Sequence, residues 1–176
     1  MNPAPTQLIL DVDGVLTDGS VIYDQHGAEL KRFNTRDGVG IRCWLRLGHT
    51  LAIITGRKSG ALEHRMSELG VPAPNVIQGC PDKLAALQDL CRRTGIAPAQ
   101  TAFIGDDWPD LGAMSACAYP MAVADADPVV KSISRFVTAQ PGGRGAVREA
   151  IEHLLHARGE HVRALAFYRG PDGPVG

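Results

Sequence analysis

Short apolar runs alternate with amphipathic stretches along most of the chain. The apolar runs have the length and the Leu, Ile and Val content of buried strands, and they lie at residues 8–12, 51–55, 75–77, 101–104, 121–124 and 136–138. Between them, apolar residues recur at helical spacing over 58–70, over 83–94 and around 147–155. Strands that alternate with helices indicate a parallel sheet covered on both faces. We therefore predict an α/β fold, a Rossmann-like three-layer sandwich with a central parallel sheet.

One segment, residues 20–33, departs from this alternation. Two short β-type runs flank the sequence Asp-Gln-His-Gly, which predicts a protruding β-hairpin. A hairpin alone is only marginally stable, so we expect it to pack against something. We place a single domain over residues 1–156, and we read residues 157–176 as a flexible tail because glycine and proline dominate their end.

Composition excludes several classes of protein. The chain has 176 residues, a formal net charge of −1 and 5% aromatic residues, which argues against a nucleic-acid binder. Its apolar runs are too short to span a membrane, and its first residues lack the features of a signal peptide. The four cysteines show no CxxC spacing and the six histidines no zinc pattern. We expect a cytoplasmic protein with reduced thiols.

Polar residues follow the predicted strands at their carboxyl ends, where ligands bind in open α/β sheets. Asp11 and Asp13 end the first strand and, one residue apart, point to the same side. Thr55 ends the second strand, Lys83 begins a helix, and Asp106 ends the strand at 101–104. Two acids at the end of a buried strand suit a divalent cation, a phosphate group and a proton transfer.

Phosphoryl transfer to an aspartate fits this set of residues. Asp11 would attack phosphorus, and Asp13 would protonate the leaving alkoxide and then deprotonate the attacking water. Carboxylate and phosphate repel each other, so a bridging cation is needed, and Mg²⁺ prefers oxygen ligands.

The remaining polar residues at the strand ends complete the predicted site. We expect the metal ligands to be Asp11, Asp106 and a backbone carbonyl near Asp13. Thr55 and Lys83 would hold phosphate oxygens. Asp107 and Asp110 would orient the waters of the metal.

The ordered set of Asp11–Asp13, Thr55, Lys83 and Asp106–Asp107 resembles the four motifs of the haloacid-dehalogenase superfamily. The resemblance implies that members with a second acid two residues after the nucleophile transfer phosphoryl groups. Most members carry a cap domain that closes over the site. The intervals between Asp13, Thr55 and Lys83 are too short for one, so we predict no cap and a site closed by the hairpin of a neighbouring subunit.

From residue 8 to 155 the chain resembles one capless branch of this superfamily, through pieces such as GAELKRFNTRDGVGI, IGDDWPDL and GGRGAVRE. The branch contains the 3-deoxy-D-manno-octulosonate 8-phosphate phosphatases, which are homotetramers of lipopolysaccharide assembly. The resemblance implies a phosphorylated keto-sugar acid as substrate and a set of contacting residues: Asn34, Thr35, Arg36, Asp37, Gly38, Arg42, Arg57 and Arg65, besides Asp13 and Lys83. It also brings Arg144 close to the substrate of a neighbouring subunit.

Structural roles compete with some of these assignments. Arg42 and Arg65 would also fit a solvated helix face, and Asp37-Gly38 would also fit a helix N-cap. Three other functions stay open: a phosphatase of nonulosonate 9-phosphates, a non-catalytic assembly module, and a two-component receiver domain. The complete set of polar groups argues against the module, and the position of both acids around Val12 argues against the receiver.

Overall fold

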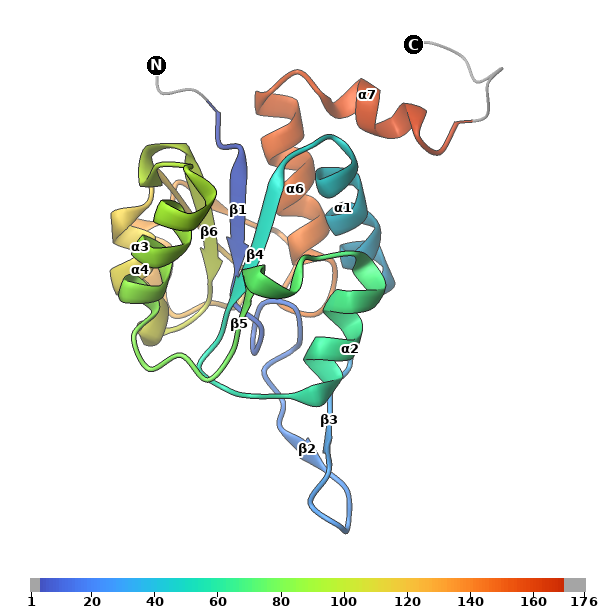
Figure 1. The fold of residues 1–176 in the computed structure, drawn as a ribbon, viewed down its shortest axis with the longest axis vertical. Helices are drawn as coiled ribbons and strands as arrows, with labels where there is room; N and C mark the ends of the chain where they lie inside the picture. Colours follow the sequence, from blue (N-terminus) through green and yellow to red (C-terminus); the bar gives the residue numbers. More distant parts are fainter. Residues whose placement is uncertain (1–3, 170–176) are drawn as a thin grey trace.

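A parallel sheet forms the centre of the protein, which we describe from a computed structural model over residues 4–169 (Figure 1). The sheet has the order β5-β4-β1-β6-β7-β8, and every adjacent pair is parallel. Its strands are β1 (Gln7–Leu10), β4 (Thr50–Ile54), β5 (Val76–Ile77), β6 (Thr101–Gly105), β7 (Tyr119–Ala122) and β8 (Phe136–Val137). All of the predicted strands are confirmed to within about two residues at each end.

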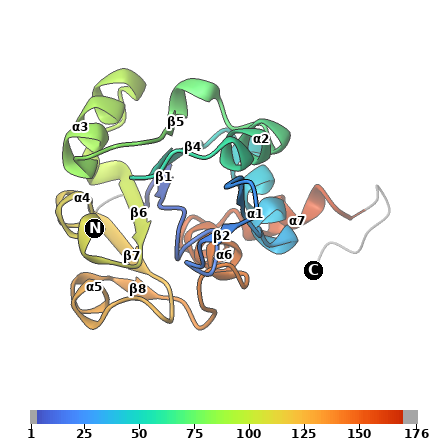
Figure 2. The same ribbon diagram turned by 90° about the horizontal axis from the view of Figure 1, so that it is seen from below.

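Helices cover both faces of the sheet, which confirms the three-layer sandwich (Figure 2). One layer holds α1 (Thr35–Arg46), α2 (Gly60–Leu69) and α6 (Ala146–Ala157), and the other holds α3 (Lys83–Thr94), α4 (Leu111–Ala116) and α5 (Pro128–Ile133). Short 3₁₀ turns connect helices and strands: η1 (Ala73–Asn75), η2 (Pro98–Gln100) and η3 (Trp108–Asp110).

The central strands are buried on both sides, as parallel strands between two helical layers must be. All four residues of β1 and all five of β6 are buried. Trp44 of α1 and Phe103 of β6 are the largest fully buried side chains, and the Trp44 indole donates a hydrogen bond of 2.8 Å to the carbonyl of Thr50. No helix among residues 4–169 is long and apolar enough to cross a membrane.

The predicted hairpin is present as β2 (Ile22–Tyr23) and β3 (Glu29–Leu30), which pair antiparallel. Asp24 orders its turn, since its Oδ1 accepts hydrogen bonds of 2.8 Å from the backbone N–H groups of His26 and Ala28. The hairpin projects from the end of the molecule at which the strands of the main sheet point (Figure 1).

The described part of the predicted tail, residues 157–169, contains a helix. Residues His161–Ala166 form a helix, α7, which packs on α6 and buries Ala164. The guanidinium of Arg158 donates to the carbonyls of Ala4 and Pro5, at 2.9 and 3.2 Å, and so ties this segment to the start of the sheet. Residues 170–176 of the predicted tail lie outside the described residues.

Candidate active site

A cleft opens at the carboxyl ends of β1, β4 and β6, where the parallel strands deliver their polar residues. Its walls are formed by the loops after these strands and by the first turn of α3. It is lined by Asp11, Asp13, Thr55, Gly56, Arg57, Lys83, Asp106, Asp107, Pro109 and Asp110. All of the predicted catalytic residues and both predicted outer acids therefore meet in one place.

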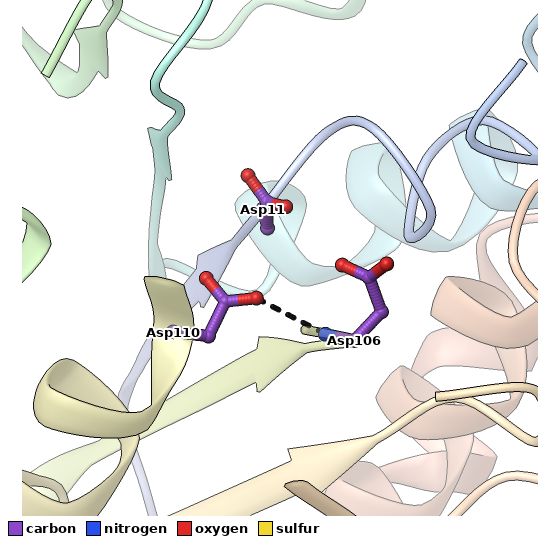
Figure 3. A group of neighbouring side chains, drawn as sticks. All are labelled: Asp11, Asp106 and Asp110. Carbon is purple, nitrogen blue, oxygen red and sulfur yellow. Dashed lines mark hydrogen bonds between the residues drawn. The ribbon is translucent and has the colours of Figure 1, made fainter. Parts of the chain in front are cut away.

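Three carboxylates face one another in this cleft (Figure 3). Oxygen atoms of Asp11, Asp106 and Asp110 all lie within 4.8 Å of one another. The ammonium of Lys83 lies 2.8 Å from Asp11 Oδ1 and 2.6 Å from Asp110 Oδ1. Asp106 Oδ1 is buried and has no hydrogen-bond partner within residues 4–169. One lysine thus balances three acids, and one carboxylate oxygen is left without a donor.

Electrostatics of this cluster favour a bound cation. Burial raises the pKa of Asp11, and the charge of Asp110 raises it further. Burial and the charges of Asp11 and Asp110 raise the pKa of Asp106 in the same way. For Lys83, burial alone would lower the pKa, but the two neighbouring carboxylates outweigh burial and raise it. A hard divalent ion with oxygen ligands would relieve the repulsion among the carboxylates, so the residues present fit Mg²⁺.

Asp110 has a more central place than its predicted role as an outer acid. Its Oδ2 accepts hydrogen bonds from the backbone N–H groups of Asp106 and Asp107, at 3.1 and 3.4 Å. Its Oδ1 binds Lys83. The same side chain therefore fixes the loop after β6 and stands among the three facing carboxylates (Figure 3).

Gly14 makes room for this cluster. It has φ +93°, and a Cβ atom there would lie 1.9 Å from Asp106 Oδ2. Any side chain at residue 14 would displace that carboxylate. The glycine after Asp13 is therefore required by the close approach of two loops as well as by its backbone conformation.

Asp13 lies apart from the three facing carboxylates. Its side chain pairs with the ammonium of Lys31, and its Oδ2 lies 3.8 Å from Arg57 Nε. Arg57 in turn donates hydrogen bonds of 2.7 Å to Glu29 Oε1 and 3.1 Å to the hydroxyl of Tyr23. The hairpin therefore contacts the site of its own chain, which sequence reasoning missed. The signal was the pair Glu29 and Lys31, two residues apart at the end of β3.

Most residues predicted to contact substrate by resemblance lie outside the cleft of this chain. Asn34 is the N-cap of α1, and its Oδ1 accepts from the N–H of Arg36 at 2.9 Å. Asp37 is 1% exposed and accepts a hydrogen bond of 2.8 Å from the N–H of Arg148 in α6. Thr35 and Arg36 are exposed at the start of α1, and Gly38 is buried behind them.

Arg42 and Arg65 share a partner on α2 instead of facing the cleft. Arg42 donates 3.1 Å to the carbonyl of Glu68, and Arg65 donates 2.8 Å to the Glu68 carboxylate. Of the predicted substrate ligands, the chain brings Asp13, Arg57 and Lys83 into its own cleft. For the other residues, contact with substrate stays a prediction.

The loop Gly142–Gly145 lies against the loop that follows Asp13. The N–H of Gly143 donates 3.0 Å to the carbonyl of Val15, and the N–H of Gly142 donates 2.9 Å to Asp125 Oδ1. A Cβ atom at Gly142 would lie 1.7 Å from the carbonyl oxygen of Gly14. These glycines therefore serve a close backbone contact within the chain, while Arg144 between them is exposed.

Comparison with known proteins agrees with this geometry. Residues 75–151 match the model of the haloacid dehalogenase-like hydrolases. The chain is 47% identical over 153 residues to the 3-deoxy-D-manno-octulosonate 8-phosphate phosphatase KdsC of Escherichia coli, over 87% of this chain and 80% of the relative.

Solved structures give the same result. A 3-deoxy-D-manno-octulosonate 8-phosphate phosphatase from Moraxella catarrhalis, in complex with magnesium, phosphate and KDO, superposes with a TM-score of 0.90 at 38% identity, over 94% of each chain. The cobalt-bound enzyme of Haemophilus influenzae superposes with a TM-score of 0.89 at 38% identity, over 94% of this chain and 98% of that one. The chain is therefore a phosphoric monoester hydrolase and belongs to the family of 3-deoxy-D-manno-octulosonate 8-phosphate phosphatases.

Proposed function

We propose that this protein hydrolyses 3-deoxy-D-manno-octulosonate 8-phosphate to the free sugar acid and phosphate, with Mg²⁺, as a step of lipopolysaccharide precursor synthesis. The observation that carries the proposal is the set of three facing carboxylates with Lys83 among them, at the end of the strand that bears Asp11. The identity of 47% to an enzyme of that name supports the choice of substrate.

The first half of the reaction belongs to Asp11 and Asp13. A carboxylate oxygen of Asp11 attacks phosphorus while the bond from phosphorus to the sugar oxygen breaks, which leaves an aspartyl-phosphate. The carboxyl of Asp13 gives its proton to the departing oxygen, so that an alcohol leaves. In the second half Asp13 takes a proton from the water that releases phosphate and restores Asp11.

The other residues of the cleft balance charge. Asp11, Asp106 and a backbone carbonyl near Asp13 would hold Mg²⁺, which would supply positive charge beside the phosphate group. Asp110 orients Lys83 and the loop after β6. Lys83 is held by Asp11 and Asp110, and the third N–H of its ammonium can bind a phosphate oxygen. The hydroxyl of Thr55, at the end of β4, can bind a second phosphate oxygen.

Phosphate release from a panel of esters tests the proposal. The panel holds 3-deoxy-D-manno-octulosonate 8-phosphate, a nonulosonate 9-phosphate and simple sugar phosphates, each with Mg²⁺ and with a chelator. We expect Mg²⁺-dependent release with the highest kcat/KM on the octulosonate ester. A higher kcat/KM on the nonulosonate ester would support the same hydrolysis mechanism but assign the protein to nonulosonate synthesis. No release from any ester by folded protein would favour an assembly module.

We also infer that the protein is a homo-oligomer, most simply a tetramer, in which a neighbouring hairpin closes the open cleft. The support is the hairpin itself, which projects from the molecule and exposes Val21, Ile22 and Leu30. Static light scattering of the wild type and of the double variant Ile22→Asp with Leu30→Asp tests this. A wild-type monomer would contradict the inference. The cytoplasmic location stays a prediction.

A further inference from the structure

Four charged side chains form a closed ring of alternating sign between the hairpin and the cleft. Lys31 contacts Asp13 Oδ1 and lies 3.5 Å from Glu29 Oε1. Arg57 lies 2.7 Å from the same oxygen of Glu29 and 3.8 Å from Asp13 Oδ2. The hairpin supplies one acid and one cation, and the catalytic loops supply the other two. Glu29 offsets one of the two cations that face Asp13.

Burial distinguishes three members of this ring from ordinary surface ion pairs, whereas the fourth, Arg57, is 41% exposed. The side chain of Lys31 is 3% exposed, that of Glu29 14% and that of Asp13 20%. The next residue, Arg32, is 63% exposed and pairs with Asp18 at the surface. Charges that are removed from water interact more strongly and hold their geometry better than surface pairs do. Lys31 is therefore placed to fix the carboxyl of Asp13, whereas Arg32 is not.

The two carboxylate oxygens of Asp13 have different contacts in the ring. Oδ1 is held by the Lys31 ammonium, while Oδ2 lies too far from Arg57 Nε for a hydrogen bond. We propose that Lys31 is a positioning residue, which turns the carboxyl of Asp13 so that Oδ2 is presented to the leaving oxygen of the substrate. This inference rests on the proposed phosphatase function, and it assigns the base of the hairpin to the active site of its own chain.

The proposal predicts a dependence on the leaving group. When an alkyl ester is cleaved, the proton of Asp13 passes to the sugar oxygen as the phosphorus–oxygen bond breaks, so a misplaced Asp13 slows this step. When p-nitrophenyl phosphate is cleaved, the leaving group departs as a stable anion and needs no proton. General acid catalysis contributes about 10²–10⁴-fold where it is required. The ratio kcat/KM covers the steps up to departure of the leaving group and is therefore the quantity to compare.

The experiment uses the full-length chain with Mg²⁺ and the variants Lys31→Met and Lys31→Arg. The matched control is Arg32→Met, which removes the cation of the next residue in the chain. We expect Lys31→Met to lower kcat/KM for the best sugar phosphate by about 100-fold, and for p-nitrophenyl phosphate by less than about tenfold. Lys31→Arg retains a cation, and we expect it to recover most of the loss on the sugar phosphate. Arg32→Met should match the wild type on both esters.

Three results would overturn the proposal. Equal losses of kcat/KM on both esters would mean that Lys31 supports only the fold, and circular dichroism melts of each variant would locate that effect. No loss in Lys31→Met would mean that Asp13 needs no partner. In both of these cases the phosphatase function stands as long as the wild type cleaves p-nitrophenyl phosphate or a sugar phosphate. The third result is a wild type that cleaves neither ester, which would refute both the phosphatase function and the role of Lys31.

Discussion

Asp11 is held in a place where a charged carboxylate is costly. It is 6% exposed, faces two other acids and has Lys83 as its nearest cation. Buried acids that repel one another are a liability for stability. These carboxylates lower the free energy of unfolding, and their repulsion is relieved only when a cation enters the cleft. A substitution at Asp11 should therefore lower activity while it leaves stability unchanged or raises it.

The first prediction concerns Asp11→Asn. The amide cannot attack phosphorus, so we expect kcat for the preferred ester to fall by about 10⁴-fold or more. The same change removes one of three like charges while its oxygen can still accept from Lys83, so the melting temperature without metal should stay the same or rise. A phosphate-release assay and a melt by circular dichroism measure the two effects. Retained turnover would contradict the assignment of the nucleophile.

The second prediction concerns pH and Mg²⁺. Burial and the neighbouring carboxylates raise the pKa of Asp106 to about 8, from an ordinary value of 3.8. Between these pH values the folded chain keeps a proton that the unfolded chain has lost, so the metal-free protein loses stability as pH rises. Mg²⁺ needs the ionised carboxylates and should restore stability more at about pH 8 than at about pH 5.

Thermal melts with and without Mg²⁺ at both pH values test this. At a metal concentration of about 100 times Kd the gain would approach about 2.7 kcal/mol. The control is Asp106→Asn, which lacks a ligand and one of the coupled charges. In that variant we expect the response to Mg²⁺ and most of the pH dependence to disappear. An equal gain from Mg²⁺ at both pH values would contradict the role of these carboxylates.

Among the elements, α1 and α6 pack against each other and are also linked by a buried carboxylate. Asp37 in the first turn of α1 accepts a hydrogen bond from the backbone of Arg148 in the first turn of α6. The first N–H groups of a helix lack partners within it, so a carboxylate from another element can act as the cap. Burial raises the pKa of Asp37, against the effect of the N–H groups of α6.

The third prediction follows from this contact. Asp37→Ala leaves the start of α6 without its acceptor, so the free energy of unfolding should fall by about 1–2 kcal/mol. Urea denaturation measures the loss. If Asp37 acts only as a cap, KM for the sugar phosphate stays within about twofold of the wild type, because KM rises only when a contact with the bound substrate is lost. A raised KM with unchanged stability would instead favour substrate contact.

The sequence predicted the elements better than the contacts between them. The apolar runs predicted the strands because the central strands β4, β1, β6 and β7 are almost wholly buried between the two helical layers. The helix Lys83–Thr94 was predicted to the residue. The role of Asp37 could not be predicted, since its partner lies 111 residues away. Lys31 was missed for the same reason, because it lies 18 residues from Asp13 in the chain and meets it only where the chain returns from the hairpin to the cleft. In α7, glycine and proline near the chain end obscured the apolar spacing of Val162, Leu165 and Phe167.

In the whole molecule, Arg158 joins the last described segment to the first. Its guanidinium donates to the carbonyls of Ala4 and Pro5 and pairs with Glu160, which also binds His49 at 2.6 Å. Phe167 packs beneath the guanidinium of Arg46 in α1, 4.3 Å from the ring centroid. The helix α7 lies at the end of the sheet opposite to the hairpin (Figure 1). The cleft lies at the carboxyl ends of the strands, away from this corner.

The fourth prediction separates this corner from catalysis. Arg158→Met removes hydrogen bonds from a charged donor that is largely buried, so the free energy of unfolding should fall by about 1.5–3 kcal/mol. Because the cleft is at the other end of the sheet, kcat should not change. Arg163→Met, an exposed arginine on α7, is the matched control and should leave stability within about 0.5 kcal/mol. Equal effects of the two substitutions would contradict the role of Arg158.

The contact between Gly142 and Gly14 has a consequence for biosynthesis. The strand that leads to Asp11 leaves the ribosome well before residues 142–145, but the loop beside it rests on those residues. Domains emerge from the amino terminus during synthesis, so the nucleophile exists long before the backbone that supports it. A truncated or stalled nascent chain would therefore have every motif residue as far as Asp110 and still no finished active site. The protein acquires its chemistry only after residues 142–145 have been synthesised.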